Sequence, residues 1–402
     1  MRGIIYMTSF KDKLNIRNKG SIIWVILMAA FFVFLYQLNT NLKYEQPADA
    51  PVGIVYEKAV VTNINSDTLE SDPDFDYIKI GKQEIDVEIT DGENKGKLVS
   101  LINFVGRVDN KPVKVGSKII IASYDDFVTS MVVNYNRETA IYILLFIFVF
   151  VVLLFGRSKG AKSLFSLFFT MVCVIFLFIP LIINGLNTIL ASIIIVIFST
   201  GVTMISLNGM SKKTLVACIS CILCTVIAGI IAYVFGRFTN ISTYNTPQMQ
   251  DLLFVAQNTS LQIKDLLFSG ILIASLGAIM DTTMSITSSI FEMNDVGTNL
   301  SKKQLFNSGM NIGKDIMGTM TNTLILAFTG SSINIIVIYF MYRLPYIQLI
   351  NIDLIVLELV QGLAGGIAVI LSIPITAFAA SELVGRENKI KEDFNVEVNY
   401  EG

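Results

Sequence analysis

Residues 269–289 read SGILIASLGAIMDTTMSITSS, an apolar run that is long enough to cross a bilayer and that carries one carboxylate, Asp281. A membrane-spanning helix needs about 20 mostly apolar residues. Ser285, Ser288 and Ser289 follow Asp281 at i+4, i+7 and i+8, so a helix carries all four on one stripe, which we expect to face other protein. Ionisable groups at bilayer depth usually mark ion paths or relays, so this stripe is a candidate functional site.

Asp281 also has a purely structural interpretation, as an inward-facing aspartate held by hydrogen bonds. The two interpretations differ in their chemistry. A proton or cation site needs the charge of the carboxylate, whereas a structural aspartate needs mainly its packing and its hydrogen bonds. Replacing Asp281 by asparagine, which keeps the size and removes the charge, therefore separates them.

The composition is that of an integral membrane protein. Of 402 residues, 53% are hydrophobic and 15% charged, and the mean hydropathy is +0.64, which excludes an ordinary soluble domain. The absence of histidine excludes His-based triads and His metal sites. Cys218, Cys221 and Cys224 form C-x-x-C-x-x-C without a charged neighbour, which favours packing over metal or redox chemistry. We expect no cofactor and no metal.

Apolar runs and their basic flanks predict the topology. Lys and Arg number 16 at the predicted cytoplasmic segments against 3 in the alternate short loops, which places both termini in the cytoplasm, with the chain in the plasma membrane. We expect about eight transmembrane helices near Ser21–Leu38, Ala140–Phe155, Leu164–Ile183, Ile189–Leu207, Leu215–Phe235, Leu266–Thr287, Ile316–Tyr342 and Leu354–Ala380.

The predicted organisation is a cytoplasmic N-terminus (1–20), a membrane anchor helix (21–38), an extracytoplasmic β-rich domain (39–139), a seven-helix membrane domain (140–380) and a cytoplasmic tail (381–402). In the β-rich domain Gln83–Thr90, Lys97–Phe104 and Val113–Ala122 are strand candidates, which suggests an OB-like or SH3-like barrel. Asp72, Asp74 and Asp76 resemble the start of a calcium loop, but the glycine and the glutamate of such a loop are replaced by Tyr77 and Gln83.

Two of the predicted spans contain residues that permit a break. One holds Gly330-Ser331-Ser332, and the last holds Gly362, Gly365 and Gly366 followed by Pro374. Such glycines allow either close helix packing or the discontinuous helices that transporters use to expose backbone groups. Close packing is the commoner use of the G-x-x-x-G spacing.

A charged stretch joins the sixth and seventh predicted spans. In a helix Asn311, Asp315, Gly318 and Asn322 form one polar, small-residue stripe, and Lys314 lies close enough to the aspartates to hold a carboxylate ionised. This stripe is expected to face the one that carries Asp281. The alternative is ordinary ion pairing at the cytoplasmic rim.

Three segments carry a family resemblance: GAIMDTTMSITSSIFEM (277–293), LFNSGMNIGKDIMGTMTNTLILAFTGSS (305–332) and GGIAVILSIPITAFAAS (365–381). They resemble the YibE/F family of bacterial multispanning membrane proteins, and the similarity covers most of the chain. It implies an anchor, a small outside domain and a helical remainder, and it supplies no catalytic residues. A fainter similarity to the SecD/SecF protein-export group, through an intramembrane aspartate and a Thr-rich span, suggests proton coupling by analogy.

The sequence therefore predicts a permease-like membrane transporter, proton- or cation-coupled, with Asp281, Ser285, Asn311, Lys314, Asp315 and Asn322 along the path. The alternative is a non-transporting assembly or scaffold protein whose outside domain binds an envelope partner. We expect no enzyme, because the chain has no histidine to complete a catalytic triad and the P-loop motif does not occur. The expected environment is the lipid bilayer, without nucleic acid.

Overall fold

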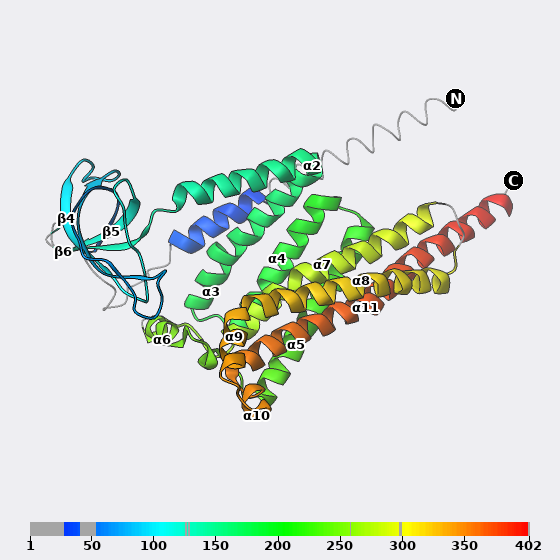
Figure 1. The fold of residues 1–402 in the computed structure, drawn as a ribbon. Helices are drawn as coiled ribbons and strands as arrows, with labels where there is room; N and C mark the ends of the chain where they lie inside the picture. Colours follow the sequence, from blue (N-terminus) through cyan, green and yellow to red (C-terminus); the bar gives the residue numbers. More distant parts are fainter. Residues whose placement is uncertain are drawn as a thin grey trace, which may run out of the picture. The chain divides into compact units, whose positions relative to one another are not determined.

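The computed structural model describes residues 28–40, 54–124, 127, 129–257, 259–296 and 300–400, the last of these with side chains up to residue 385. The chain divides into two compact units (Figure 1). The β unit comprises Gln46–Gly156, and the helical unit comprises Met1–Glu45 and Arg157–Gly402. The division falls inside one long helix at Arg157, whose φ of 45° and ψ of −128° are not helical.

The described part of the β unit holds six antiparallel strands that form a half-barrel. They are β1 (Val55–Asp67), β2 (Glu70–Ser71), β3 (Lys79–Ile89), β4 (Leu98–Val105), β5 (Lys118–Tyr124) and β6 (Thr129–Tyr135). The order is β2-β3-β1-β5-β6, and β4 pairs with β3. Alternation places Ile85, Val87 and Ile89 of β3 in a core with Val61 of β1 and Ile119 of β5.

The strand predictions for Gln83–Thr90 and Lys97–Phe104 are confirmed by β3 and β4. The predicted strand Val113–Ala122 begins only at Lys118. The preceding residues form a turn, in which the Ser117 N–H donates to the Lys114 carbonyl at 2.9 Å and Gly116 takes a φ of +85°.

Asp72 and Asp74 bind an arginine in the β unit. The Arg107 guanidinium donates to both carboxylates, and Asp72 also accepts the backbone N–H groups of Asp74 at 2.9 Å and Phe75 at 3.2 Å. Burial alone would raise the pKa of Asp72, but these hydrogen bonds and the Arg107 charge outweigh it, so that the pKa lies below its usual range. The run that resembles a calcium loop therefore holds an arginine.

The helical unit contains the remaining described elements and part of α2, whose first residues belong to the β unit. The elements are a helix over Met28–Thr40, α2 (Glu138–Cys173), η2 (Val174–Phe178), α3 (Ile179–Ile183), α4 (Thr188–Asn208), α5 (Lys212–Phe238), η3 (Thr243–Asn245), α6 (Met249–Gln257), α7 (Leu266–Asp295), α8 (Lys302–Ser331), α9 (Ile333–Met341), α10 (Tyr346–Leu349) and α11 (Asp353–Tyr400).

Side-chain caps start three of the long helices. Asn187 accepts the N–H of Ile189 at 3.0 Å at the start of α4, and Ser211 accepts the N–H of Thr214 at 3.1 Å at the start of α5. Ser301 and Gln304 form a reciprocal capping box at the start of α8. These caps satisfy backbone groups that the helix itself leaves without partners.

The core of the helical unit lies where α7 packs against α4, α5, α8 and α11 (Figure 1). Glycine permits the close approach of α8 and α11, because a Cβ on Gly313 would lie 2.1 Å from the Ile373 side chain. The glycines of α11 serve the same packing: Gly365 contacts Leu324, and α11 continues through Pro374 without a break. The glycines of the last predicted span therefore serve close packing, the commoner of their two uses, and only the possible break at Ser331-Ser332 is present among the described residues.

Within the described residues, five helical segments are long and apolar enough to cross a membrane: Glu138–Ile183, α4, α5, α7 and Asp353–Gly385 of α11. The α8–α9 pair makes a sixth if it counts as one bent span. Glu138–Ile183 contains two predicted spans that meet near Arg157. Part of the predicted anchor lies outside the described residues, and the rest is the shorter apolar helix Met28–Thr40. Eight spans remain a prediction.

Candidate functional site

The register between α7 and α8 follows from two close contacts. A Cβ on Gly309 of α8 would lie 2.7 Å from Ile290 of α7. Farther along, a Cβ on Gly365 would lie within 3.5 Å of both Leu324 of α8 and Ser275 of α7. The first contact pairs α8 with α7 directly, and the second places one residue of each helix against the same glycine of α11, so the two helices run antiparallel.

Counting inward from these contacts places Asp281 level with Gly318 and Ser285 level with Lys314. Asp281 also lies midway along α7, which begins at Leu266 and ends at Asp295. The predicted site residues on the two helices therefore occupy the same depth.

The Asp281 stripe faces away from the packed core. Asp281 and Ser285 are exposed, whereas Thr282, Thr283 and Thr287 on the opposite face of α7 are fully buried. The prediction that the Asp281 stripe packs against other protein is therefore wrong for the described chain. The hydroxyls of Thr282 and Thr283 are satisfied by carbonyls of their own helix, which is how a threonine face can pack in an apolar core.

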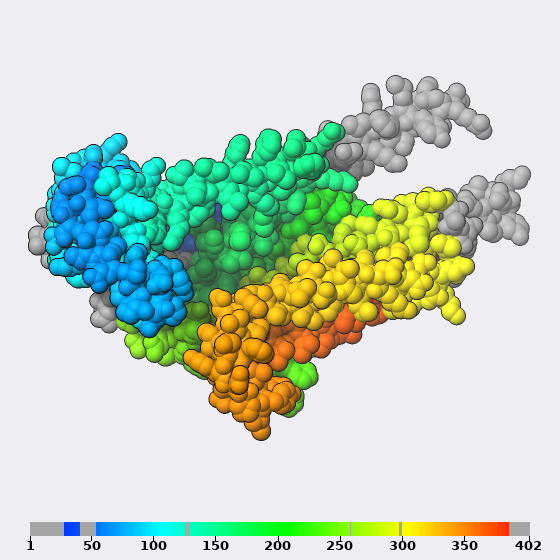
Figure 2. All heavy atoms as spheres, viewed as in Figure 1, coloured from blue at the N-terminus to red at the C-terminus, as the bar shows by residue number. Residues whose placement is uncertain are grey.

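The predicted stripe on α8 is also uncovered. Gly309 and Gly313 face α11, and Asn311, Asp315 and Asn322 lie on the other side of the helix, where they are exposed. Figure 2 shows α8, in yellow, as a ridge on the surface of the molecule. Both polar stripes thus lie on faces that the helical unit does not use for packing.

The exposed polar groups lack side-chain partners within the described part of the chain. In the part of the chain that the structure describes, no side-chain hydrogen bond or ion pair is formed by the site residues Asp281, Ser285, Asn311, Lys314, Asp315 and Asn322. Lys314, which the sequence places close enough to the aspartates to hold a carboxylate ionised, forms no ion pair with any of them among the described residues. Ion pairs do occur toward the same ends of the helices, Lys213–Glu292 at 3.9 Å and Lys302–Glu382 at 3.0 Å, but they leave out Lys314 and Asp315.

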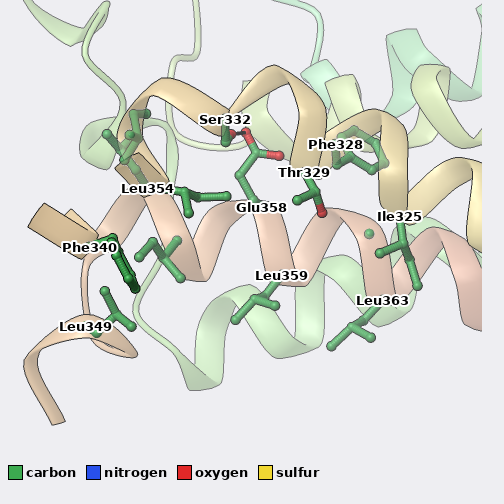
Figure 3. Close-up of a pocket in the computed structure, with 14 residues that line it drawn as sticks. Ile325, Phe328, Thr329, Ser332, Phe340, Leu349, Leu354, Glu358, Leu359 and Leu363 are labelled. Atoms are coloured by element: carbon green, nitrogen blue, oxygen red, sulfur yellow. Dashed lines mark hydrogen bonds between the residues drawn. The ribbon is translucent and has the colours of Figure 1, made fainter. Parts of the chain in front are cut away.

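A second polar group lies at the break between α8 and α9. The two helices are bent by 63° around Ser332, whose side chain is buried. The Ser332 hydroxyl donates to Glu358 Oε1 of α11 at 2.6 Å, as the dashed line in Figure 3 shows. The other oxygen, Oε2, is shielded from solvent and has no hydrogen-bond partner among the described residues.

Glu358 lines a cavity of about 360 Å³ that is bounded by residues of α8, α9, α10 and α11. The other lining side chains are almost all apolar, among them Ile325, Phe328, Phe340, Leu349, Leu354 and Leu359 (Figure 3). No lining residue is basic. The cavity therefore combines an apolar wall with one incompletely bonded carboxyl group.

The structure shows no arrangement suited to a metal. Among the described residues no group of three or more Cys, Asp or Glu side chains is placed to hold a metal ion. Cys221 and Cys224 are fully buried with a free thiol each, in a core that includes Val196 and Leu276. Their environment is that of packing residues.

A family model described as YibE/F-like protein matches residues 144–386, more than half of the chain. The chain belongs to the YibE/F-like family. No curated protein matches the chain, and no solved structure does. The YibE/F-like region extends from α2 into α11 and includes Asp281, Lys314, Asp315 and Glu358, whereas the six strands of the β unit lie outside it.

Glu358 is the residue of this YibE/F-like protein that sequence reasoning missed. Two signals were available: a carboxylate inside the apolar run Leu354–Ala380, and the break expected at Gly330-Ser331-Ser332. Their connection depends on tertiary structure, because Ser332 and Glu358 come from elements separated by α9 and α10. The family match agrees with the resemblance noted in the sequence.

Proposed function

We propose that this YibE/F-like protein is a permease-like membrane transporter in which Asp281 binds a proton or a cation. The observation that carries the proposal is the exposure of Asp281, midway along the apolar helix α7, without any partner in the described chain. Ser285 at the level of Lys314, and Asn311 and Asn322 on α8, would supply neutral hydrogen-bonding groups along the same face.

The physical support is the cost of unpaired charge in lipid. A charged side chain at the centre of a membrane helix costs about 2.5–3.5 kcal/mol on insertion scales, and larger values come from isolated helices. Asp281, midway along an apolar helix, would carry this cost if its exposed side faced lipid. A water-lined path beside α7 and α8 removes that cost and gives the groups a function.

The proposed setting is the bacterial plasma membrane, with both termini in the cytoplasm and the β unit outside, and the proposed activity is not enzymatic. The basic residues at one set of loops support this orientation. Single cysteines at Asp91 and Lys212 should then label from opposite faces of the membrane with an impermeant reagent. Labelling from the same face would overturn the orientation.

The test of the transport proposal is Asp281→Asn. The variant should insert and accumulate normally and lose proton-dependent flux in vesicles, while Asp281→Glu keeps part of it because the charge is retained. A matched control is Glu292→Gln, at the end of the same helix. Normal cellular function of the Asn variant would contradict the proposal.

A scaffold role is the second candidate. The observation in its favour is an exposed apolar row on β4, formed by Leu98, Ile102 and Phe104, which is the kind of surface that binds a protein partner. On this alternative an envelope protein contacts β4, Asp281→Asn is tolerated, and charged substitutions in the row abolish function.

A further inference from the structure

We propose that the cavity at the α8–α9 break binds a small amphiphilic organic cation, an ammonium with N–H donors and an apolar body, with Glu358 as the anion. This site does not depend on the proposed transport role. Ser332 lies 14 positions beyond Gly318, the residue level with Asp281, which is about 21 Å along a helix at 1.5 Å per residue.

The charge argument begins at the two oxygens of Glu358. Oε1 accepts from the Ser332 hydroxyl at 2.6 Å, and Oε2 is shielded from solvent without a donor. A buried polar atom without a partner is unfavourable, and more so when it carries charge. No basic residue lines the cavity, so the described chain does not supply the missing donor itself. A ligand N–H would supply it.

The apolar argument rests on the rest of the wall. The cavity of about 360 Å³ is within the size range of small-molecule sites, and its lining includes Phe328, Leu354 and Leu359. Thr329 faces the same space, and its hydroxyl forms no hydrogen bond within the described residues, so it offers a second polar contact near Glu358 (Figure 3). A ligand with one charged end and an apolar body satisfies both features, whereas an acyl chain leaves Oε2 unpaired.

The backbone break explains why the site forms at this point. The two helices meet at Ser332 with a bend of 63°, and residues on both sides of the bend line the cavity. Gly362 of α11 lies beneath the cavity, where an added Cβ would be 3.8 Å from Phe328 and 3.9 Å from Ile325. A methyl group fits there, and a larger side chain enters the cavity.

The experiment measures binding of 1-naphthylmethylammonium, a fluorescent ammonium, to the full chain in nanodiscs of phosphatidylcholine, whose headgroup has no N–H donor. The neutral counterpart is 1-naphthylmethanol, which has the same apolar body. We expect saturable binding of one ammonium per chain. Glu358→Gln should weaken it about 10- to 100-fold, the range for losing a hydrogen bond to a charged group, while Glu292→Gln leaves it unchanged.

Two further measurements keep the result decisive. Gly362→Leu leaves Glu358 intact and occludes the cavity, so it should also abolish ammonium binding, which covers the case in which the Gln variant fails to fold. The alcohol should bind weakly and equally to the wild type and to Glu358→Gln. The proposal would be overturned if the ammonium showed no saturable binding to the wild type. It would also be overturned if Glu358→Gln bound the ammonium as tightly as the wild type does, or if the alcohol bound as tightly as the ammonium.

Discussion

In both Asp72 of the β unit and Glu358 of the helical unit, a carboxylate oxygen is shielded from solvent, but the hydrogen-bond partners of the two carboxylates differ. Asp72 receives the Arg107 guanidinium and two backbone N–H groups. Glu358 receives one serine hydroxyl, and its second oxygen faces an apolar cavity without a partner. A fully bonded carboxylate fixes a fold, whereas a partly bonded one beside a cavity is poised to bind something else.

Asp281 extends the comparison to a third environment. Among the described residues it has neither burial in the core nor a side-chain partner, although it lies midway along an apolar helix. The three carboxylates therefore predict three responses to substitution: loss of folding at Asp72, loss of binding at Glu358 and loss of flux at Asp281.

The largest effect on folding is expected for Asp72→Ala. The substitution removes a buried carboxylate that binds the half-exposed Arg107, and it leaves the backbone N–H groups of Asp74 and Phe75 without their acceptor. The isolated fragment 54–136 should fold and unfold cooperatively by circular dichroism, and the variant should unfold at a much lower temperature. Asp76→Ala, an exposed neighbour, is the control, and equal losses in both variants would contradict the structural role of Asp72.

A second prediction concerns Gly313 and Gly318, on opposite sides of α8. A Cβ at Gly313 meets Ile373 at 2.1 Å, whereas one at Gly318 meets nothing within 4 Å. Gly313→Ala should therefore destabilise the helical unit by about 1–3 kcal/mol, the usual range for overpacking. Gly318→Ala should leave the stability unchanged. Thermal unfolding of the two variants in nanodiscs gives the comparison. Similar destabilisation in both would mean that the uncovered face of α8 is packed in the membrane.

Acid should lower the stability of the β unit, by less than the substitution Asp72→Ala does. The pKa of Asp72 lies below its usual value. The pKa of Asp86 is also lowered, because its carboxylate accepts a hydrogen bond from the Ser100 hydroxyl, and the pKa of Asp91 is lowered by its hydrogen bond with Lys58. A lowered folded-state pKa stabilises the fold above the unfolded value of about 3.9 and loses that contribution as the pH falls through the folded value. The unfolding temperature of the fragment should thus fall between about pH 5 and pH 2. A flat profile would contradict the cited shifts, and Asp72→Asn should flatten it in part.

The smallest effect on stability is expected for Glu358→Gln. The amide keeps an oxygen for Ser332 and removes a charge that lacks a full set of partners, so the unfolding temperature in nanodiscs should remain unchanged or rise. A large decrease would show that Glu358 is bonded as completely as Asp72, and the comparison between the two would fail.

Much of the architecture was predictable from the sequence, for identifiable reasons. The long apolar runs predicted α4, α5 and α7, because few other structures tolerate some 20 apolar residues in succession. Strict alternation over Ile85, Val87 and Ile89 predicted β3 and its inward face. The break at Ser331-Ser332 was likewise anticipated from small residues in an overlong span.

The orientation of α7 was not predictable, because both faces carry small polar residues. Asp281 and Ser285 lie on one face, and Thr282, Thr283 and Thr287 lie on the other, so periodicity alone cannot identify the buried side. Thr282 and Thr283 can pack inward because their hydroxyls donate to carbonyls of their own helix, an option that an ionised carboxylate lacks. The pairing of Glu358 with Ser332 was equally hidden, since it depends on how α8 and α11 pack.

The most direct test of the account is whether the exposed face of α7 and α8 contacts water in the membrane. In a variant lacking the four native cysteines, single cysteines at Ser285 and Asn322 are compared with one at Leu223, an exposed apolar position midway along α5. The account predicts that Ser285→Cys and Asn322→Cys react with a charged, membrane-impermeant thiol reagent, whereas Leu223→Cys reacts only with an apolar one. Reaction of all three with the apolar reagent alone would contradict the proposed path.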